Sequence, residues 1–389
     1  MPRSLTAVLL VVFLTYTGQF VAYPIIPLYV IEKGGSAFDV GTTVFLNLIL
    51  AAVLAVPMGA LSDRIGRRTV AIMGASAGTV AHLLLPFADT PLEILLAFAI
   101  AGVGHAGYGP SLLATIGEAA SREKLATSFG WATVARQSGN FVGPAVGGFL
   151  ASLYGLSGSF VACGLFQMVG GLAALVAVPP RSAGAGPSGR ITKSSARAEL
   201  RWALGQLGIV APLVSTLMGA FAVQGYRSFI PLFAADLGAD PSVIGILFTV
   251  QAIVNVVARV PFARYSDRTG RRAPFVTYGL LMMALSLGLL TLVPNVYVVM
   301  GWSAVMGIGL SMAMSASLAI VGERVHREAR GAVFGLNNTS VYGGQGLGSI
   351  FTGFAVELYG FGVGFGLLAA FLLASVLSFF LMSRRAGIR

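Results

Sequence analysis

Long apolar runs separated by short polar loops make up most of the chain. Twelve such runs are present, and each is long enough to cross a membrane, which takes about 20 apolar residues. They lie at roughly 5–30, 39–61, 69–88, 93–117, 126–151, 157–178, 206–233, 241–262, 273–293, 295–321, 331–356 and 361–382. The pattern therefore predicts an all-α polytopic membrane protein with twelve transmembrane helices, and the even number returns both termini to the same side.

The second half of the chain repeats the first. The loop VPMGALSDRIGRR at 56–68 returns as VPFARYSDRTGRR at 260–272, an offset of 204 residues. Further along, GEAASREKLATSFG at 117–130 matches GERVHREARGAVFG at 322–335, at an offset of 205. A repeat of hydrophobic segments at half the chain length is typical of transporters built from two like bundles. We therefore expect two pseudo-symmetric six-helix bundles with the same orientation in the membrane.

The longest polar segment sets the expected division of the chain. Residues 179–205 begin with a Gly-, Pro- and Ser-rich stretch and continue as ITKSSARAELRWALG. This composition predicts a flexible cytoplasmic linker that leads into a short basic amphipathic helix on the membrane surface. A disordered linker throughout is the alternative. The first six-helix bundle would then span 1–178 and the second 206–389.

The distribution of charge sets the expected orientation. Of the 389 residues, 56% are hydrophobic and 10% are charged, and the net charge is +11. When loops are assigned to alternate sides, 21 of the 25 Lys and Arg fall on the side of both termini. Only Lys33 falls on the other side, while Arg136, Arg227 and Arg259 lie inside runs. Because basic residues concentrate in cytoplasmic loops, we expect a multi-pass protein of the cell inner (plasma) membrane with both termini in the cytoplasm. The basic charge then reflects topology, and no nucleic-acid partner is expected.

The sequence offers little for a metal site or for catalysis. Cys163 is the only cysteine and the three histidines are not clustered, so neither a disulfide framework nor a metal-binding spacing is found. We therefore expect no enzyme activity, no catalytic residues, no metal and no cofactor. A receptor without transport activity is harder to exclude, but it gives no reason for two matched loops. The oligomeric state is left open.

Two motifs carry a family resemblance. The segment GALSDRIGRR, in the loop after the second run, resembles the signature of the major facilitator superfamily. The segment GNFVGPAVGG at 139–148 resembles the GxxxGPxxGG motif of its twelve-helix drug:proton antiporters, and the resemblance covers the whole chain. It implies the major facilitator fold and a secondary active transporter that exports small amphipathic compounds by alternating access, in exchange for protons.

The fourth run departs from that antiporter pattern. The resemblance places Phe98 where the family has an Arg and Ala101 where it has the following Gln. This departure leaves a second possibility open, an exporter or facilitator of an anionic metabolite or lipid without proton coupling.

The charged loops are the expected gate. Asp63 lies just beyond the second run, where its carboxylate can accept hydrogen bonds from the N–H groups at a neighbouring helix start. The resemblance implies that this partner is the start of the eleventh helix, near Arg330, so that Asp63 acts as a latch between the halves. Loop arginines would contact anionic lipid headgroups. The expected gating residues are Gly59, Asp63, Gly66, Arg67, Asp267, Gly270, Arg271, Glu118, Arg122, Glu323 and Arg327. Loops that only fix topology, and ordinary interfacial Glu–Arg pairs, are the alternatives.

The antiporter-like motif predicts a smooth helix face. Gly139, Gly143 and Gly147 recur at four-residue spacing, Pro144 removes a backbone hydrogen bond beside them, and Gly148 ends the motif. Such a face allows another helix to approach closely. Simple packing of small residues is the alternative.

Basic groups without acidic partners mark the expected substrate site. All 14 Asp and Glu lie in loops or at the ends of runs, whereas Arg136, Arg227, Arg259, His82 and His105 lie inside runs. Charged residues inside a membrane indicate function, and a cavity lined by Arg favours an anionic or zwitterionic group on a small-molecule substrate. Expected substrate contacts are Tyr23, Arg227, Arg136, Asn47, Gln251 and Asn255. His105 is the expected proton carrier because it can titrate near neutral pH, with a structural hydrogen bond between helices as the alternative.

Overall fold

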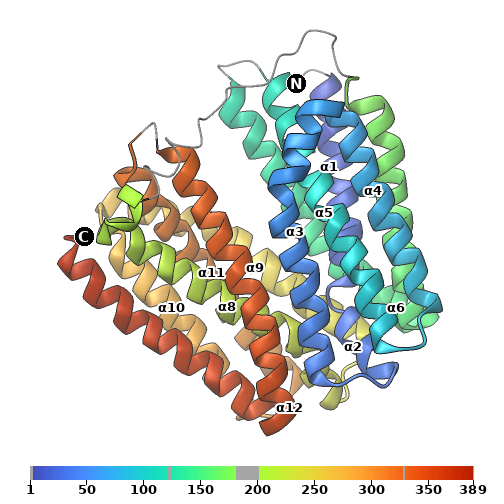
Figure 1. Cartoon of the computed structure of the whole chain (residues 1–389). Helices are drawn as coiled ribbons and strands as arrows, with labels where there is room; N and C mark the ends of the chain where they lie inside the picture. Colours follow the sequence, from blue (N-terminus) through green and yellow to red (C-terminus); the bar gives the residue numbers. More distant parts are fainter. Residues whose placement is uncertain (1–2, 121–123, 181–200, 327–328, 389) are drawn as a thin grey trace. The chain divides into compact units, whose positions relative to one another are not determined.

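The computed structural model describes residues 3–120, 124–180, 201–326 and 329–388, and all regular structure in these ranges is helical. The first half contains α1 (Arg3–Ala22), α2 (Ile26–Glu32), α3 (Ala37–Ile65), α4 (Arg67–Leu84), the short η1 (Leu85–Phe87), α5 (Pro91–Ala119) and α6 (Leu125–Ala177). The second contains α8 (Leu207–Asp236), α9 (Pro241–Thr269), α10 (Ala273–Leu289), α11 (Val296–Arg324) and α12 (Arg330–Arg385) (Figure 1).

These helices account for the twelve predicted passes. In the described part of the chain, nine helices are long and apolar enough to cross a membrane, and α10 is a shorter apolar helix. Two of the nine, α6 with 53 residues and α12 with 56, are long enough to cross twice. Each of these two bends at a glycine, Gly155 or Gly360, instead of passing through a loop. The prediction of an all-α polytopic membrane fold is confirmed.

The internal repeat is visible in the backbone. Gly155 and Gly360, 205 residues apart, have φ values of 76° and 77°, and Gly34 and Gly238, 204 residues apart, both have φ of 80°. Glycine is favoured at such positive φ values because it has no Cβ. Helix packing repeats in the same way, since α1 packs mainly against α6 and its repeat mate α8 mainly against α12.

The chain forms two compact units whose boundaries differ slightly from the predicted ones. The first unit is Met1–Gly189 with Gly238–Thr249, and the second is Arg190–Leu237 with Val250–Arg389. The loop before α9 and its first turns therefore group with the first unit. Residues 181–200, where most of the predicted amphipathic helix falls, lie outside the described ranges.

The residues just before α8 pack onto the second unit. Residues 201–204 are helical, and Ala203 is fully buried. The Trp202 ring lies 4.9 Å, centroid to centroid, from the ring of His326 in the segment between α11 and α12. The end of the polar segment is thus attached to this second unit.

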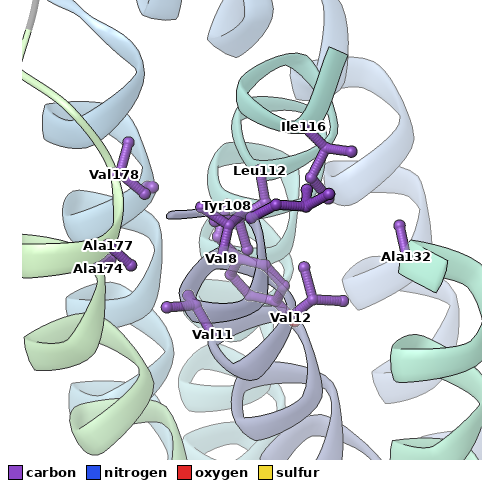
Figure 2. Packing of buried hydrophobic residues seen from close by; sticks show 12 residues of the cluster. Val8, Val11, Val12, Tyr108, Leu112, Ile116, Ala132, Ala174, Ala177 and Val178 are labelled. Atoms are coloured by element: carbon purple, nitrogen blue, oxygen red, sulfur yellow. The ribbon is translucent and has the colours of Figure 1, made fainter. Parts of the chain in front are cut away.

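One hydrophobic cluster joins α1, α5 and both ends of α6 (Figure 2). Val8, Val11 and Val12 of α1 pack with Tyr108 and Leu112 of α5. The other labelled members of the cluster are Ile116, Ala132, Ala174, Ala177 and Val178. This packing fixes the face of α5 that carries Tyr108 against α1, which positions the polar residues described below.

Candidate functional site

A cluster of charged and hydroxyl groups joins α3, α4 and α5 at the α3–α4 turn. Arg67 lies at its centre, 2.5 Å from the carboxylate of Asp63 and 3.1 Å from that of Glu118. Its Nη1 also donates to Ser62 Oγ at 3.3 Å, and Ser111 Oγ donates to the same Ser62 oxygen at 3.1 Å. One guanidinium thus holds three helices together at one end of the first unit.

The second unit repeats this cluster around Arg272. Its guanidinium lies 2.5 Å from the carboxylate of Asp267 and 2.9 Å from that of Glu323. Its Nη1 donates to Ser266 Oγ at 3.1 Å. Partial burial opposes the charge of Arg272, but the hydrogen bonds and charges of the two carboxylates outweigh it and raise its pKa above the ordinary value.

The central arginine of the second cluster is Arg272, whereas the sequence pattern pointed to Arg271. The two loop motifs align residue for residue at an offset of 204, which pairs Arg67 with Arg271. In the first half α4 begins at Arg67, directly after Gly66, whereas two residues separate Gly270 from α10 at Ala273. The offset therefore becomes 205 within this loop, and Arg272 takes the structural position of Arg67.

The glutamates of the two clusters contact the arginines of the turns. We expected Glu118 to pair with Arg122 and Glu323 with Arg327. Arg122 and Arg327 lie outside the described residues, so those pairs stay a prediction. Sequence reasoning also missed the two serines that precede the aspartates. The repeat could have identified these serines, because both loops contain the sequence Ser-Asp-Arg.

Two glycines of the first loop differ in what they do. Gly66 has φ of 103° and forms the sharp turn between α3 and α4. Gly59 lies inside α3, and among the described residues no heavy atom lies within 4 Å of a Cβ built on it. Its repeat mate is Ala263. Packing within the first unit therefore gives no reason for a glycine at position 59, and the latch role of Asp63 stays a prediction.

The antiporter-like motif has two faces in the structure, and the first is pressed against α1. A Cβ built on Gly139 would lie 2.8 Å from Thr17 N, and one on Gly143 would lie 2.7 Å from Phe20 Cβ. Real Cβ atoms essentially never come that close to another heavy atom. The small residues of this face therefore allow α1 and α6 to touch along their backbones, as the spacing suggested.

The second face of the motif meets the first turns of α9, all within the first unit. A Cβ on Gly148 would lie 2.9 Å from Gly245 Cα, and a Cβ on Gly245 would overlap the carbonyl oxygen of Pro144. Thr249 Oγ1 donates to the carbonyl oxygen of Phe141 at 2.8 Å. A second helix thus approaches α6 closely at the proline of the motif.

A stripe of aromatic rings on α1 and in the turn directly after it connects two of the expected substrate contacts. The rings of Tyr16 and Phe20 lie 6.4 Å apart, and those of Phe20 and Tyr23 lie 5.3 Å apart. The guanidinium of Arg136, an exposed residue of α6, lies 5.9 Å from the Tyr16 ring centroid, within range of a cation–π contact. Tyr16 was missed at the sequence level, although its spacing to Phe20 and Tyr23 places all three on one helix face.

Three of the expected substrate contacts are buried in helix packing. Asn47 is 2% exposed, and its amide nitrogen donates to the carbonyl oxygen of Phe98 at 2.8 Å, which joins α3 to α5. Asn255 donates to the Gly307 carbonyl oxygen at 3.1 Å and accepts from Arg259 at 3.2 Å. The third residue, Gln251, is also buried. These positions hold neighbouring helices together, and their contact with substrate stays a prediction.

The remaining candidates lie on different units or in a buried network. Tyr23 belongs to the first unit, and Arg227, which is partly buried in α8, belongs to the second. His105 Nδ1 lies 3.4 Å from Gln19 Nε2, and Tyr108 donates to the Oε1 of the same amide at 2.8 Å. The predicted proton carrier is therefore part of a hydrogen-bonded group that joins α1 to α5.

Acidic side chains lie at the ends of the helices. The described carboxylates lie in loops, in the first or last turns of helices, or beside the bend of α12, namely Glu32, Asp39, Asp63, Asp89, Glu93, Glu118, Asp236, Asp240, Asp267, Glu323 and Glu357. Within the described ranges, no three His, Cys, Asp or Glu side chains gather where they could hold a metal ion.

The comparisons with known proteins agree with this architecture. The chain is a polytopic helical membrane transporter, because the profile of the Major Facilitator Superfamily matches residues 8–233 and 212–387. It belongs to that superfamily. The curated relatives include the quinolone resistance protein NorA of Staphylococcus aureus, 21% identical over 90% of this chain and 88% of NorA. They also include the multidrug resistance protein MdtG of Proteus mirabilis, 23% identical over 90% and 88%.

Solved structures share the fold at low identity. A bacterial homologue of the human lysosomal transporter Spinster, in an inward-facing and unoccupied conformation, superposes with a TM-score of 0.85 at 16% identity, covering 98% of this chain and 96% of the other. The nucleoside transporter NupG gives 0.83 at 14% identity, with coverages of 98% and 100%. The predicted family and fold are therefore confirmed.

Proposed function

We propose that this protein exports small amphipathic compounds that carry an anionic or zwitterionic group, by alternating access and in exchange for protons. The observation that carries the proposal is the exposed guanidinium of Arg136 beside the aromatic stripe of α1. A cation inside a membrane-spanning segment indicates a functional site. Aromatic rings beside it add apolar contact area for the body of an amphipathic molecule.

The position of the carboxylates supports the proposed charge preference. A desolvated cationic drug needs a negative group close by, since an unpaired charge is heavily penalised away from water. The described carboxylates lie at helix ends, whereas Arg136, Arg227 and Arg259 lie within helices that cross the membrane. The names of NorA and MdtG refer to resistance to quinolones and to multiple drugs, and they support export of drug-like compounds.

We also propose that the two arginine-centred clusters form the cytoplasmic gate. Asp63 would release Arg67 in part and accept hydrogen bonds from the start of α12, near Arg330, in the state closed to the cytoplasm. The open surface over Gly59 supports this proposal, because a helix can approach there without meeting a side chain. A helix start offers free N–H groups and a partial positive charge to such a carboxylate.

Binding to purified protein tests the charge preference. We expect an anionic or zwitterionic aromatic compound, such as a zwitterionic quinolone, to raise the thermal stability more than a permanent cation of matched size. Arg136→Ala and Arg227→Ala should weaken that effect, and the corresponding Lys variants should retain part of it. Tighter binding of the permanent cation, unchanged by either Ala variant, would contradict the proposal.

Transport in proteoliposomes tests the coupling. A pH gradient imposed across the vesicle membrane should drive accumulation of the compound found to bind, and His105→Gln should abolish that accumulation while leaving downhill flux. Accumulation that is independent of the gradient would instead support the alternative, a facilitator or exporter of an anionic metabolite or lipid without proton coupling. The departure at Phe98 and Ala101 favours that alternative.

A further inference from the structure

Five buried side-chain polar atoms in the first unit have no hydrogen-bond partner among the described residues: Thr43 Oγ1 of α3 and four atoms on α4, α5 and α6 that belong to three side chains. The four atoms are His82 Nε2 of α4, His105 Nε2 of α5, and both amide atoms of Gln167 in α6. Leaving a buried polar group without a hydrogen bond destabilises the folded protein. Four such atoms on three neighbouring helices therefore call for a physical explanation.

Close backbone contacts place these side chains on adjoining turns of α4, α5 and α6. A Cβ on Gly104 would lie 2.9 Å from Gly78 N, so α4 and α5 touch at these two glycines. His105 follows Gly104 directly, and His82 lies one helical turn beyond Gly78. The Gln167 amide lies against Gly78, because a Cβ placed there would overlap its Oε1. The helices concerned, α4, α5 and α6, pack against one another.

The hydrogen bonds of the two rings indicate which histidine nitrogen carries the proton. His82 Nδ1 lies 2.7 Å from the carbonyl oxygen of Gly78, which can only accept, so Nδ1 is protonated and Nε2 is a free acceptor. On the other ring, Gln19 Oε1 accepts from Tyr108, so Gln19 Nε2 points its N–H groups toward His105 Nδ1. His105 Nδ1 is then the acceptor, and its Nε2 carries the hydrogen.

These assignments leave a complementary set of donors and acceptors. His105 Nε2–H and the Gln167 amide nitrogen can donate, while His82 Nε2 and Gln167 Oε1 can accept. A buried water molecule makes about three hydrogen bonds to otherwise unsatisfied groups. We propose that a water molecule binds among His82, His105 and Gln167, and that it carries a proton from His105 to His82.

The proton transfer balances without any other reactant. A proton from the substrate pathway binds His105 Nδ1 while Gln19 rotates its amide so that Oε1 accepts it. His105 Nε2 passes its own proton to the water, and the water passes one to His82 Nε2. His105 is again neutral, and His82 holds the extra proton as an imidazolium, with Nδ1–H still on the Gly78 carbonyl oxygen. Release runs the same steps in reverse.

The groups around His82 favour reversible loading. His82 contacts the Gly78 carbonyl oxygen and the ring of Phe98, and the polar groups in contact with its relay partner His105 or with α1 beside it are Gln19, Tyr108 and the Cys163 thiol. The thiol donates to the Gly18 carbonyl oxygen at 2.6 Å and is already satisfied. None of these groups is a carboxylate, so the described contacts offer a proton on His82 no ion-pair partner that would hold it there.

The use of this site in coupling rests on the proposed proton exchange, but the water site itself can be tested without transport. The chain has only three histidines, so ¹⁵N-histidine solid-state NMR of the protein in lipid bilayers gives few signals, and His326→Asn assigns the third. We expect His82 to be protonated at Nδ1, His105 at Nε2, and water magnetisation to reach both Nε2 atoms. The opposite tautomers in the wild-type protein would overturn the proposed water site. The absence of magnetisation transfer from water to His82 would overturn it as well, and neither result needs a variant of the site.

Two variants separate the water site from its use. Gln167→Leu removes two partners of the water and should reduce water transfer to both rings, and unchanged transfer would overturn the assigned position. His82→Gln should abolish pH-driven accumulation in proteoliposomes while downhill flux remains. If His82→Gln transports with full coupling, the relay is refuted even though the water site stands. If the wild-type protein shows no coupling, the proposed proton exchange fails instead.

Discussion

Arg67 and Arg272 hold the same structural position in the two units, although the loop motif around them repeats at 204 residues and the arginines lie 205 apart. Each bridges the aspartate of its own turn and the glutamate at the end of the next long helix in its repeat, α5 or α11. Both units therefore build the same three-helix junction from loops of different length.

Replacing Arg272 should cost more than replacing Arg271. Arg272→Gln removes two ion pairs and the hydrogen bond to Ser266, and because the carboxylates are more than half exposed the loss should be about 1 kcal/mol. Arg271→Gln is the matched control with the same charge change. Thermal unfolding of the purified variants measures the difference. An equal loss of thermal stability in the two variants would show that the change in net charge, and not the loss of the junction contacts, destabilises the protein.

Asp63→Asn should leave expression and folding near normal while slowing transport. The substitution weakens one state of a two-state cycle, and a change in the relative stability of two states shifts their populations. Distances between spin labels on the ends of α3 and α12 should shift toward the state open to the cytoplasm. The latch reading would be abandoned if both the distances and the transport rate stayed as in the wild type, and Asp267→Asn provides the comparison in the second unit.

Two glycines of α6 should respond to the same substitution with opposite sign. Gly143→Ala places a Cβ 2.7 Å from Phe20 Cβ, and such overpacking costs about 1–3 kcal/mol. Gly130→Ala meets no described heavy atom within 4 Å and should stabilise the helix by about 0.5–1 kcal/mol, because alanine loses less backbone entropy on folding. Thermal denaturation in one detergent compares the two. A similar shift for both would mean that α1 does not press on α6 in solution.

Both termini should be cytoplasmic. A reporter enzyme that is active only outside the cytoplasm should give no signal when fused after Arg389 and should give one when fused after Asp89 or Asp236. The reason is the concentration of Lys and Arg in loops on the side of the termini. The reverse pattern of activity would overturn the orientation and, with it, the placement of the gate.

Hydropathy predicted the twelve passes, and the resemblance of the motifs GALSDRIGRR and GNFVGPAVGG to known signatures predicted the family. The apolar runs placed breaks at 152–156 and 357–360, but they did not predict that the chain turns there at a single glycine, Gly155 or Gly360, without a loop. The sequence also did not predict the position of Arg272. The two loop motifs align without a gap, so the alignment does not show that the second loop is longer before its helix begins.

Contacts between distant segments were the part of the site that the sequence could not supply. The sequence identified Asn47 and Asn255 as polar residues in apolar runs, but not the carbonyl groups that they bind. In the same way, the small residues of the antiporter-like motif were recognised, while the approach of Gly245 to its proline was not, because nothing local indicates which helix fills a smooth face.

The bend of α6 at Gly155 makes a single mechanical element of two passes. The first pass carries the antiporter-like motif, pressed between α1 and the first turns of α9, and the second carries Gln167. With one glycine at the corner and no loop to absorb displacement, a tilt of the first pass has to move the second. A change in the packing around Pro144 would then shift the second pass, and with it Gln167, relative to the two histidines. No chain of side-chain contacts between the two places is needed for that shift.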